Sequence, residues 1–111
     1  ERIILDVLKA YPDAVRQKCE NGWMTLHYVC MTMMHAETTK KIIESILDTY
    51  SDAAKHVDNQ YKTPLHHAAE NNNVSMDVMQ VLLNAYPEAA SQMDILGKMP
   101  LHYAVETWVD G

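Results

Sequence analysis

The chain has 111 residues and a formal net charge of −6 at pH 7. Nucleic acids and anionic membrane surfaces bind basic faces, and the chain has no Lys/Arg cluster beyond Lys40 and Lys41, so its composition argues against both as partners. No run of about 18 apolar residues occurs, so the sequence predicts no direct membrane insertion either.

The first predicted element is a helix that ends at Tyr11. Its apolar residues stand at offsets i, i+1, i+4, i+5 and i+8, which lie on one stripe of a helix, and the same offsets precede Tyr50 and Tyr86. The hydroxyl groups of Thr39 and Ser75 are expected to cap the starts of the later two helices. We interpret all three as the second helix of a repeating unit.

Polar turns and further helices alternate with these elements. We expect projecting turns at residues 19–24, 58–63 and 94–99. We expect the first helix of each unit at residues 25–33, 64–71 and 100–107. Proline has a preset φ and lacks an N–H that is not needed at a helix start, which supports starts at Pro64 and Pro100.

Anchor residues recur at a constant distance, which makes this a repeat protein. Leu26, Leu65 and Leu101 each follow a tyrosine of the pattern by 15 residues, and a histidine follows each leucine. The period is 39 residues and then 36, which is typical of stacked supersecondary units. We expect further repeats or domains in the same polypeptide. The expected parts are the end of a preceding unit at 1–18, units at 19–57 and 58–93, and the first part of another unit at 94–111.

The segment TPLHHAA, from Thr63 to Ala69, resembles the helix opener T-P-L-H-x-A of the ankyrin repeat. The opener recurs as MTLHYVC from Met24 and as MPLHYAV from Met99. The long period and the AYPEAA segment at the end of a second helix are similar to a long-period variety of this family. The resemblance implies an all-α ankyrin-repeat solenoid, in which antiparallel helix pairs stack and their turns project.

Two departures from the family's pattern affect the framework. The family's opener threonine hydrogen-bonds the opener histidine, and in this chain only Thr63 can do so, for His66, so His27 and His102 need other partners. Tyr61 stands where the other two turns have glycine, and a bulky residue with positive φ is costly. We therefore expect the middle turn to be reshaped.

The side chains that could bind a metal or take part in catalysis are better explained as structural residues of the repeat. His66 with Glu70, and His102 with Glu106, are i, i+4 pairs that could face one metal ion, but two ligands do not make a site. A histidine at one place in every unit is expected to make a framework hydrogen bond. The serines lack a strand-turn-helix elbow and no glycine-rich loop occurs, so we predict no catalytic residue, metal or cofactor, and no enzyme.

We predict a protein-binding module, an ankyrin scaffold or adaptor, because array surfaces are extended rather than concave around small substrates. Its partner is another protein, whose identity the sequence does not contain. Two alternatives stay open: a regulatory or targeting segment of a larger protein, and a structural subunit of a large assembly. Cys19 and Cys30 fall at different positions of the unit and are expected to be free thiols, which favours an intracellular, reducing compartment.

The resemblance implies a contact surface at the turn tips and at the C-terminal ends of the first helices. The positions are Glu20, Asn21, Trp23, Met31, Thr32, Asn59, Gln60, Lys62, Glu70, Asn71, Ile95, Leu96, Lys98, Glu106 and Thr107. Trp23, Ile95 and Leu96 are apolar where a solitary array would prefer polar groups, so they are the predicted anchors of binding. The alternative is that these three side chains only pack between neighbouring turns.

Overall fold

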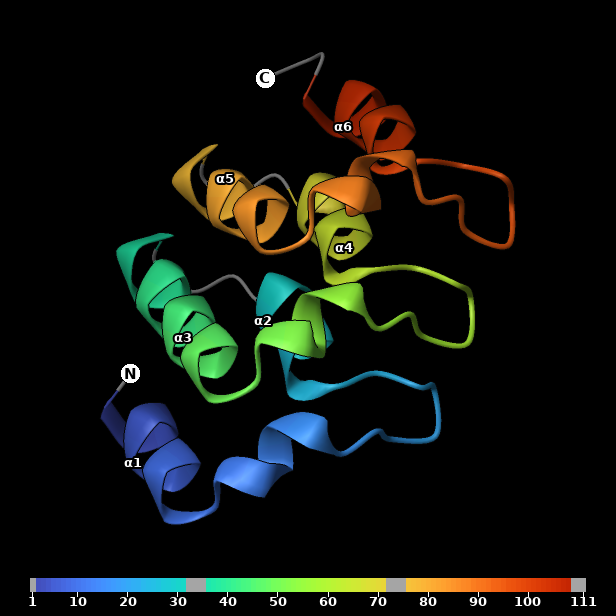
Figure 1. Ribbon diagram of the computed structural model, residues 1–111. Helices are drawn as coiled ribbons and strands as arrows, with labels where there is room; N and C mark the ends of the chain where they lie inside the picture. The colour runs from blue at the N-terminus through green and yellow to red at the C-terminus, as the bar shows by residue number, and fades with distance from the viewer. Residues whose placement is uncertain (1, 32–35, 72–75, 109–111) are drawn as a thin grey trace.

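The computed structural model describes residues 2–31, 36–71 and 76–108 of the chain. Within these residues the α-helices are α1 (Arg2–Ala10), α2 (Thr25–Met31), α3 (Ala36–Thr49), α4 (Pro64–Glu70), α5 (Met76–Ala85) and α6 (Pro100–Trp108). The short 3-10 helices η1 (Pro12–Arg16), η2 (Ser51–Lys55) and η3 (Pro87–Ser91) follow α1, α3 and α5. The predicted all-α solenoid is confirmed (Figure 1).

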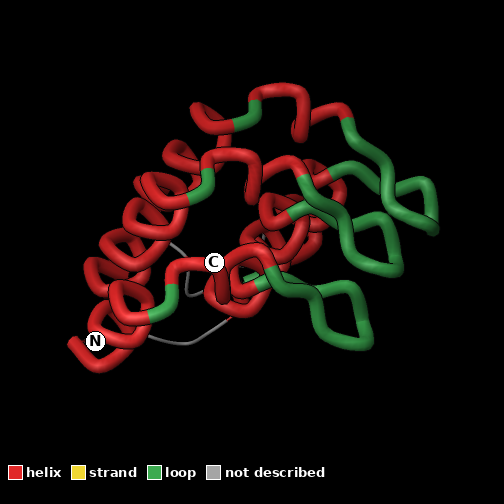
Figure 2. Tube along the Cα trace, turned by 60° about the horizontal axis from the view of Figure 1, so that its bottom comes forward, coloured by secondary structure: helices red, strands yellow, loops and turns green. Residues whose placement is uncertain are grey.

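Two layers of helices and a row of turns make up the fold. In Figure 1, α1, α3 and α5 form one layer and α2, α4 and α6 the second, and the turns project from the second layer on the side away from the first. Within the second layer α4 packs against both α2 and α6, while across the layers α2 packs on α3 and α4 packs on α5. The three turns lie side by side, as the tube in Figure 2 shows.

The core is built from the apolar stripes that face the space between the two layers. On α3, Ile42, Ile43 and Ile46 are at most 1% exposed, and the same holds for Val78 and Leu82 on α5. Their offsets are those that the sequence pattern predicted for a second helix. Every residue of α4 except the last is buried, because α2, α5 and α6 pack around this helix.

α3 begins earlier than the sequence pattern predicted. The predicted cap, Thr39, lies inside the helix and is 3% exposed, because the helix already starts at Ala36. Alanine and glutamate are strong helix formers, and the carboxylate of Glu37 in the first turn interacts favourably with the positive end of the helix dipole. The other predicted cap, Ser75, lies outside the described residues.

The 3-10 helices were not predicted from the sequence. Each follows the tyrosine after a second helix and begins with a hydrogen bond to that tyrosine, as from Ala53 N–H to the carbonyl of Tyr50 at 3.1 Å. Alanine is the third residue of every one of these segments, and Ala53 and Ala89 are at most 1% exposed. A small side chain lets the chain turn tightly against the helices, which explains the alanine three residues after each tyrosine.

The middle turn is not reshaped, contrary to the expectation from Tyr61. The φ of Tyr61 is 61°, close to the 77° of Gly22 and the 76° of Gly97, so each turn has one residue in the left-handed region. This conformation costs an L-residue about 1 to 2 kcal/mol. Asp58 holds the turn closed by accepting two main-chain N–H groups, and the Tyr61 side chain is 57% exposed, so its bulk extends into solvent.

We expect Leu65→Ala to destabilise the fold far more than Leu101→Ala, although both residues occupy the same position of the unit. Leu65 is 3% exposed and belongs to the core, whereas Leu101 is 70% exposed. A buried Leu→Ala change costs about 2 to 5 kcal/mol. Urea denaturation of the two variants measures the difference, and equal unfolding midpoints would contradict the assignment of Leu65 to the core.

We expect Gly22→Ala to cost more stability than Gly97→Ala. Both glycines have nearly the same positive φ, so both variants share the strain of an L-residue there, about 1 kcal/mol. A Cβ atom at Gly22 would lie 2.9 Å from the main-chain nitrogen of Asn59 and 2.5 Å from its Oδ1, whereas a Cβ at Gly97 meets nothing within 4 Å. Thermal unfolding of the two variants measures this contact between turns, and a larger loss for Gly97→Ala would refute it.

Candidate protein-binding surface

The three turns are joined to one another by hydrogen bonds. Asn59 N–H donates to the carbonyl of Asn21 at 2.9 Å, and Ile95 N–H donates to the carbonyl of Gln60 at 2.8 Å. The side-chain amide of Asn59 also donates to the carbonyl of Glu20 at 2.8 Å. The predicted tip residues therefore lie along one continuous edge of the molecule (Figure 2).

A carboxylate closes the second and third turns from inside. Oδ1 of Asp58 accepts from Gln60 N–H at 2.9 Å and from Lys62 N–H at 3.0 Å, and Asp94 is held by two equivalent bonds in the third turn. Burial alone would raise the pKa of the Asp58 carboxyl, but the two N–H donors and the His67 side chain outweigh burial, so this pKa lies below its ordinary value. The carboxylate is therefore ionised, which allows it to accept these several hydrogen bonds at once.

The first residue of each turn also pairs with the side chain nine residues later, directly after the framework histidine. The pairs are Cys19 with Tyr28, Asp58 with His67, and Asp94 with Tyr103. The tyrosines donate through their hydroxyl groups, and Nε2 of His67 donates to Oδ2 of Asp58 at 2.8 Å. The Tyr28 hydroxyl is the main reason that the pKa of the Cys19 thiol is lowered. Sequence reasoning missed these pairs, for which the constant spacing was the available signal.

A buried histidine links the first full unit to the turn of the next. His27 is 0% exposed; its Nδ1 accepts from Met24 N–H at 3.0 Å, and its Nε2 lies 3.2 Å from the carbonyl of Lys62. A carbonyl can only accept, so Nε2 bears the proton and the ring is the neutral tautomer whose Nδ1 is free to accept. One imidazole thus accepts a hydrogen bond from the N–H at the start of its own helix and donates one that positions the following turn.

His66 makes the same bridge between its own helix start and the third turn. Its Nδ1 accepts from Thr63 N–H at 3.1 Å, and its Nε2 lies 3.0 Å from the carbonyl of Lys98. The Thr63 hydroxyl lies 2.9 Å from the same Nδ1, as the resemblance implies. Where methionine replaces threonine, the main-chain N–H alone is the donor, as from Met99 to Nδ1 of His102 at 2.9 Å.

Burial keeps these imidazoles neutral. Burial is the main cause that lowers the pKa of His27 to about 4, and the His67 ring, whose centroid is 5.5 Å away, lowers it further. Burial also lowers the pKa values of His66 and His67, against the opposing effect of their hydrogen-bond acceptors. Nδ1 of His67 is buried without a hydrogen-bond partner among the described residues, so a proton on it would be unsatisfied.

Acidification from about pH 7 to about pH 5 should destabilise the fold. In the unfolded chain His27 is protonated near its ordinary pKa of 6.5, but in the folded chain only near about 4, so the unfolded state binds more protons in this window. The loss from His27 alone is about 2 kcal/mol at about pH 5, since one pKa unit corresponds to about 1.4 kcal/mol. Urea denaturation across this range measures the slope of stability against pH.

His27→Gln should flatten that slope, because the variant lacks the imidazole that takes up a proton on unfolding. His102→Gln, at an exposed histidine of the same position in the unit, is the matched control for the loss of an Nδ1 acceptor at a helix start. A wild-type stability that does not vary over this pH range would refute the role given to the buried histidines.

Most of the predicted contact residues are accessible. The exposed ones are Glu20, Asn21, Met31, Asn59, Gln60, Ile95, Leu96 and Glu106. The half-buried ones are Trp23, Lys62, Glu70, Asn71, Lys98 and Thr107, and Thr32 lies outside the described residues. A pocket of about 270 Å³ between the first two turns is lined by four of the predicted residues, Asn21, Trp23, Asn59 and Gln60.

Trp23 contacts both its own unit and the next one. Its ring centroid lies 4.9 Å from that of Tyr28 and 5.1 Å from that of His67, and both contacts are edge-on. A substitution of Trp23 would therefore disturb the joint between two units as well as the turn tip. Ile95 and Leu96 differ from Trp23, because they are 61% and 71% exposed.

Two lysine–glutamate pairs cross from the second and third turns to the ends of the first helices. Nζ of Lys62 lies 2.6 Å from Oε1 of Glu70, and Nζ of Lys98 lies 3.1 Å from Oε1 of Glu106. Both ammonium groups also lie over the ring of Tyr103, at 4.8 and 5.1 Å from its centroid. The lysines are therefore held between turn and helix rather than extended into solvent.

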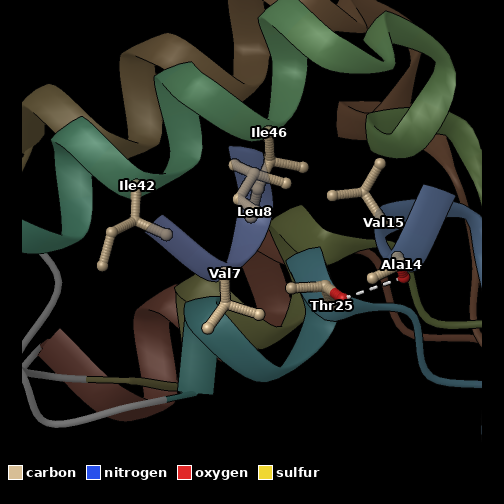
Figure 3. Close-up of a pocket in the computed structure, with 7 residues that line it drawn as sticks. All are labelled: Val7, Leu8, Ala14, Val15, Thr25, Ile42 and Ile46. Atoms are coloured by element: carbon tan, nitrogen blue, oxygen red, sulfur yellow. Dashed lines mark hydrogen bonds between the residues drawn. The ribbon is translucent and has the colours of Figure 1, made fainter. Parts of the chain in front are cut away.

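An apolar pocket of about 270 Å³ lies between α1, η1, α2 and α3, apart from the turn tips. Its walls, drawn in Figure 3, are Val7, Leu8, Ala14, Val15, Thr25, Ile42 and Ile46. The hydroxyl of Thr25 donates to the carbonyl of Ala14 at 3.3 Å, so even this polar side chain is satisfied within the wall. No predicted contact residue lines this pocket, which is therefore separate from the candidate surface.

The described residues contain neither a cluster of metal ligands nor a helix that could span a membrane. Across 2–31, 36–71 and 76–108, no three or more His, Cys, Asp or Glu side chains are grouped so that they could hold a metal ion. In the same ranges no helix has the length and apolar character needed to cross a membrane. Cys19 and Cys30 are both free thiols, and burial raises the pKa of Cys30 well above its ordinary value.

A comparison with protein-family models matches residues 33–109 to the model described as ankyrin repeats (3 copies). A search among curated proteins found no match. The matched range covers more than half of the chain and contains the TPLHHAA segment, the second and third turns, and the helices α3 to α6. The chain belongs to the ankyrin repeat family.

Proposed function

We propose that this chain binds another protein through the tips of its turns and the C-terminal ends of its first helices. Ankyrin repeats are generally protein–protein interaction modules and are typically non-catalytic. The proposed contact residues are those predicted from the sequence, with Ile95 and Leu96 as anchors. The observation that carries the proposal is the exposure of these two apolar side chains on a turn whose main chain is held by hydrogen bonds.

The third turn presents its apolar side chains from a restrained main chain. Ile95 N–H donates to the carbonyl of Gln60 at 2.8 Å, and Leu96 N–H donates to Oδ1 of Asp94 at 2.9 Å. A turn that is ordered before binding loses little further conformational entropy on binding, so more of the contact energy appears as affinity. Fixed and exposed apolar groups are typical of an interaction site.

The division of the chain into units belongs to the same proposal. Each turn is closed by a hydrogen bond from its first N–H to the carbonyl of its fifth residue, at 2.9 to 3.0 Å, and the first residues are Cys19, Asp58 and Asp94. We place the unit boundaries directly before these residues. Each turn tip then belongs with the helix end that follows it, and one unit contributes one segment of the contact surface.

Leu96→Ser should weaken partner binding and leave the thermal midpoint unchanged, because a residue that is 71% exposed contributes little to the core. Truncation of an apolar anchor costs about 2 kcal/mol or more of binding free energy, which is about a 30-fold loss of affinity. Partners captured from native extract can be identified by mass spectrometry and purified, and calorimetry then measures their affinities for both forms of the chain.

Met76→Ser is the matched control, because Met76 is 75% exposed but lies at the start of α5, in the helix layer away from the turns. It should change neither affinity nor midpoint. Trp23→Ala should lower both, since this ring also packs against His67. The proposal is wrong if Leu96→Ser leaves the affinity of every purified partner unchanged.

A further inference from the structure

Two positions of the unit lie on either side of the junction between turn and first helix, eight residues apart. They are occupied by Trp23 and Met31, by Lys62 and Glu70, and by Lys98 and Glu106. We name these six residues the turn–helix surface. This surface includes residues of all three turns and of the first helices that follow them.

In its two charged pairs, the carboxylate is the more exposed partner. The Lys62 side chain is 13% exposed against 31% for Glu70, and the Lys98 side chain is 36% exposed against 58% for Glu106. Both ammonium groups lie over the Tyr103 ring. A partner that approaches from solvent therefore meets the negative member of each pair more readily than the positive one.

Among the described residues, the excess of negative charge lies mainly on the turns and first helices, although Asp58 and Asp94 are buried within their turns. The turns and first helices carry five acidic side chains, Glu20, Asp58, Glu70, Asp94 and Glu106, against the two lysines Lys62 and Lys98. The rest of the described chain carries eight acidic side chains against seven basic ones, so it is nearly balanced. Charge complementarity steers encounters between proteins, so this side favours a cationic partner.

The first unit is apolar at both positions of the surface. Met31 is 42% exposed, and Trp23 lines the pocket between the first two turns. Methionine and tryptophan are enriched in interfaces, where methionine adapts to irregular partners and tryptophan provides a large contact area. The turn–helix surface is thus apolar at one end, and along the rest it carries two lysine–glutamate pairs in which the glutamate is the more exposed member.

We propose that the turn–helix surface binds an extended basic segment of the partner, with an apolar side chain over Trp23 and Met31 and a lysine or arginine opposite each of Glu70 and Glu106. This inference rests on the proposed protein-binding function and names the partner's chemistry. Packed helices lie about 8 to 10 Å apart and an extended chain advances about 3.3 Å per residue, so neighbouring units correspond to about three residues of the segment. The expected motif is one apolar and two basic residues at intervals of three.

Fluorescence anisotropy with labelled synthetic peptides tests this motif. The probe contains leucine, arginine and arginine at intervals of three residues with serine and glycine spacers, and it is made in both chain directions. One control peptide has glutamate in place of both arginines, and another has serine in place of leucine. In one direction the arginine peptide should bind about tenfold more tightly than the glutamate peptide at low salt, and added salt should reduce this difference because the charges are exposed.

Variants of the protein assign the contacts to residues. Glu70→Gln together with Glu106→Gln should weaken binding of the arginine peptide about tenfold. The matched control is Glu37→Gln together with Glu44→Gln, which removes the same charge from exposed positions of α3 and should leave binding unchanged. Glu70→Lys together with Glu106→Lys should shift the preference toward the glutamate peptide. Met31→Ser should weaken binding of the leucine peptide but not of its serine counterpart.

Circular dichroism and thermal midpoints show whether each variant keeps its fold. The inference is overturned if the arginine peptide binds no better than the glutamate peptide in either direction, or if the two glutamine pairs have equal effects. Its failure is distinguishable from failure of the proposed function. If Leu96→Ser loses purified partners while the Glu70 and Glu106 variant keeps them, protein binding stands and the basic motif does not.

Discussion

The bridge that a buried imidazole makes between two units is the interaction on which the rest of this structure depends. His27 and His66 each accept from the N–H at the start of their own helix and donate to a carbonyl of the following turn. One side chain therefore satisfies a helix start and sets the position of the next unit. Because Nδ1 must accept, the bridge requires the neutral imidazole, so stacking, turn position and histidine protonation are coupled.

The frame that this bridge maintains tolerates different chemistry at equivalent positions. Cys19 stands where the other two turns have an aspartate, yet the hydrogen bond that closes its turn measures 3.0 Å, within the 2.9 to 3.0 Å of all three turns. Tyr61 adopts the left-handed conformation that glycine adopts in the other turns. In both cases the main-chain bonds and the contact with a neighbouring unit determine the local shape, and they override the preference of the single residue.

The sequence predicted the repeat, its helix stripes and the exposure of most turn tips, because each of these follows from burying one face of a periodic element. It failed at the start of α3 and where the outcome depends on contacts between elements. The pattern predicts a cap at Thr39, whereas Ala36 and Glu37 extend the helix in the N-terminal direction. The half-burial of Trp23 depends on His67 in the next unit, and no local pattern specifies that contact. The pairs of side chains nine residues apart could have been predicted from the sequence, but only by comparing the units with one another.

Burial leaves few positions of a unit free to determine what it binds. In α4 every residue but Glu70 is buried, so substitutions elsewhere in this helix act on stability before they act on any partner. The accessible positions are the turn tip and the end of the helix, and the imidazole bridges of His27 and His66 link each unit to the turn of the next. Under the proposed function, a few side chains per unit select the partner in a fixed order. On the proposed turn–helix surface, that order is set by Trp23 and Met31 in one unit and by lysine–glutamate pairs in the next two.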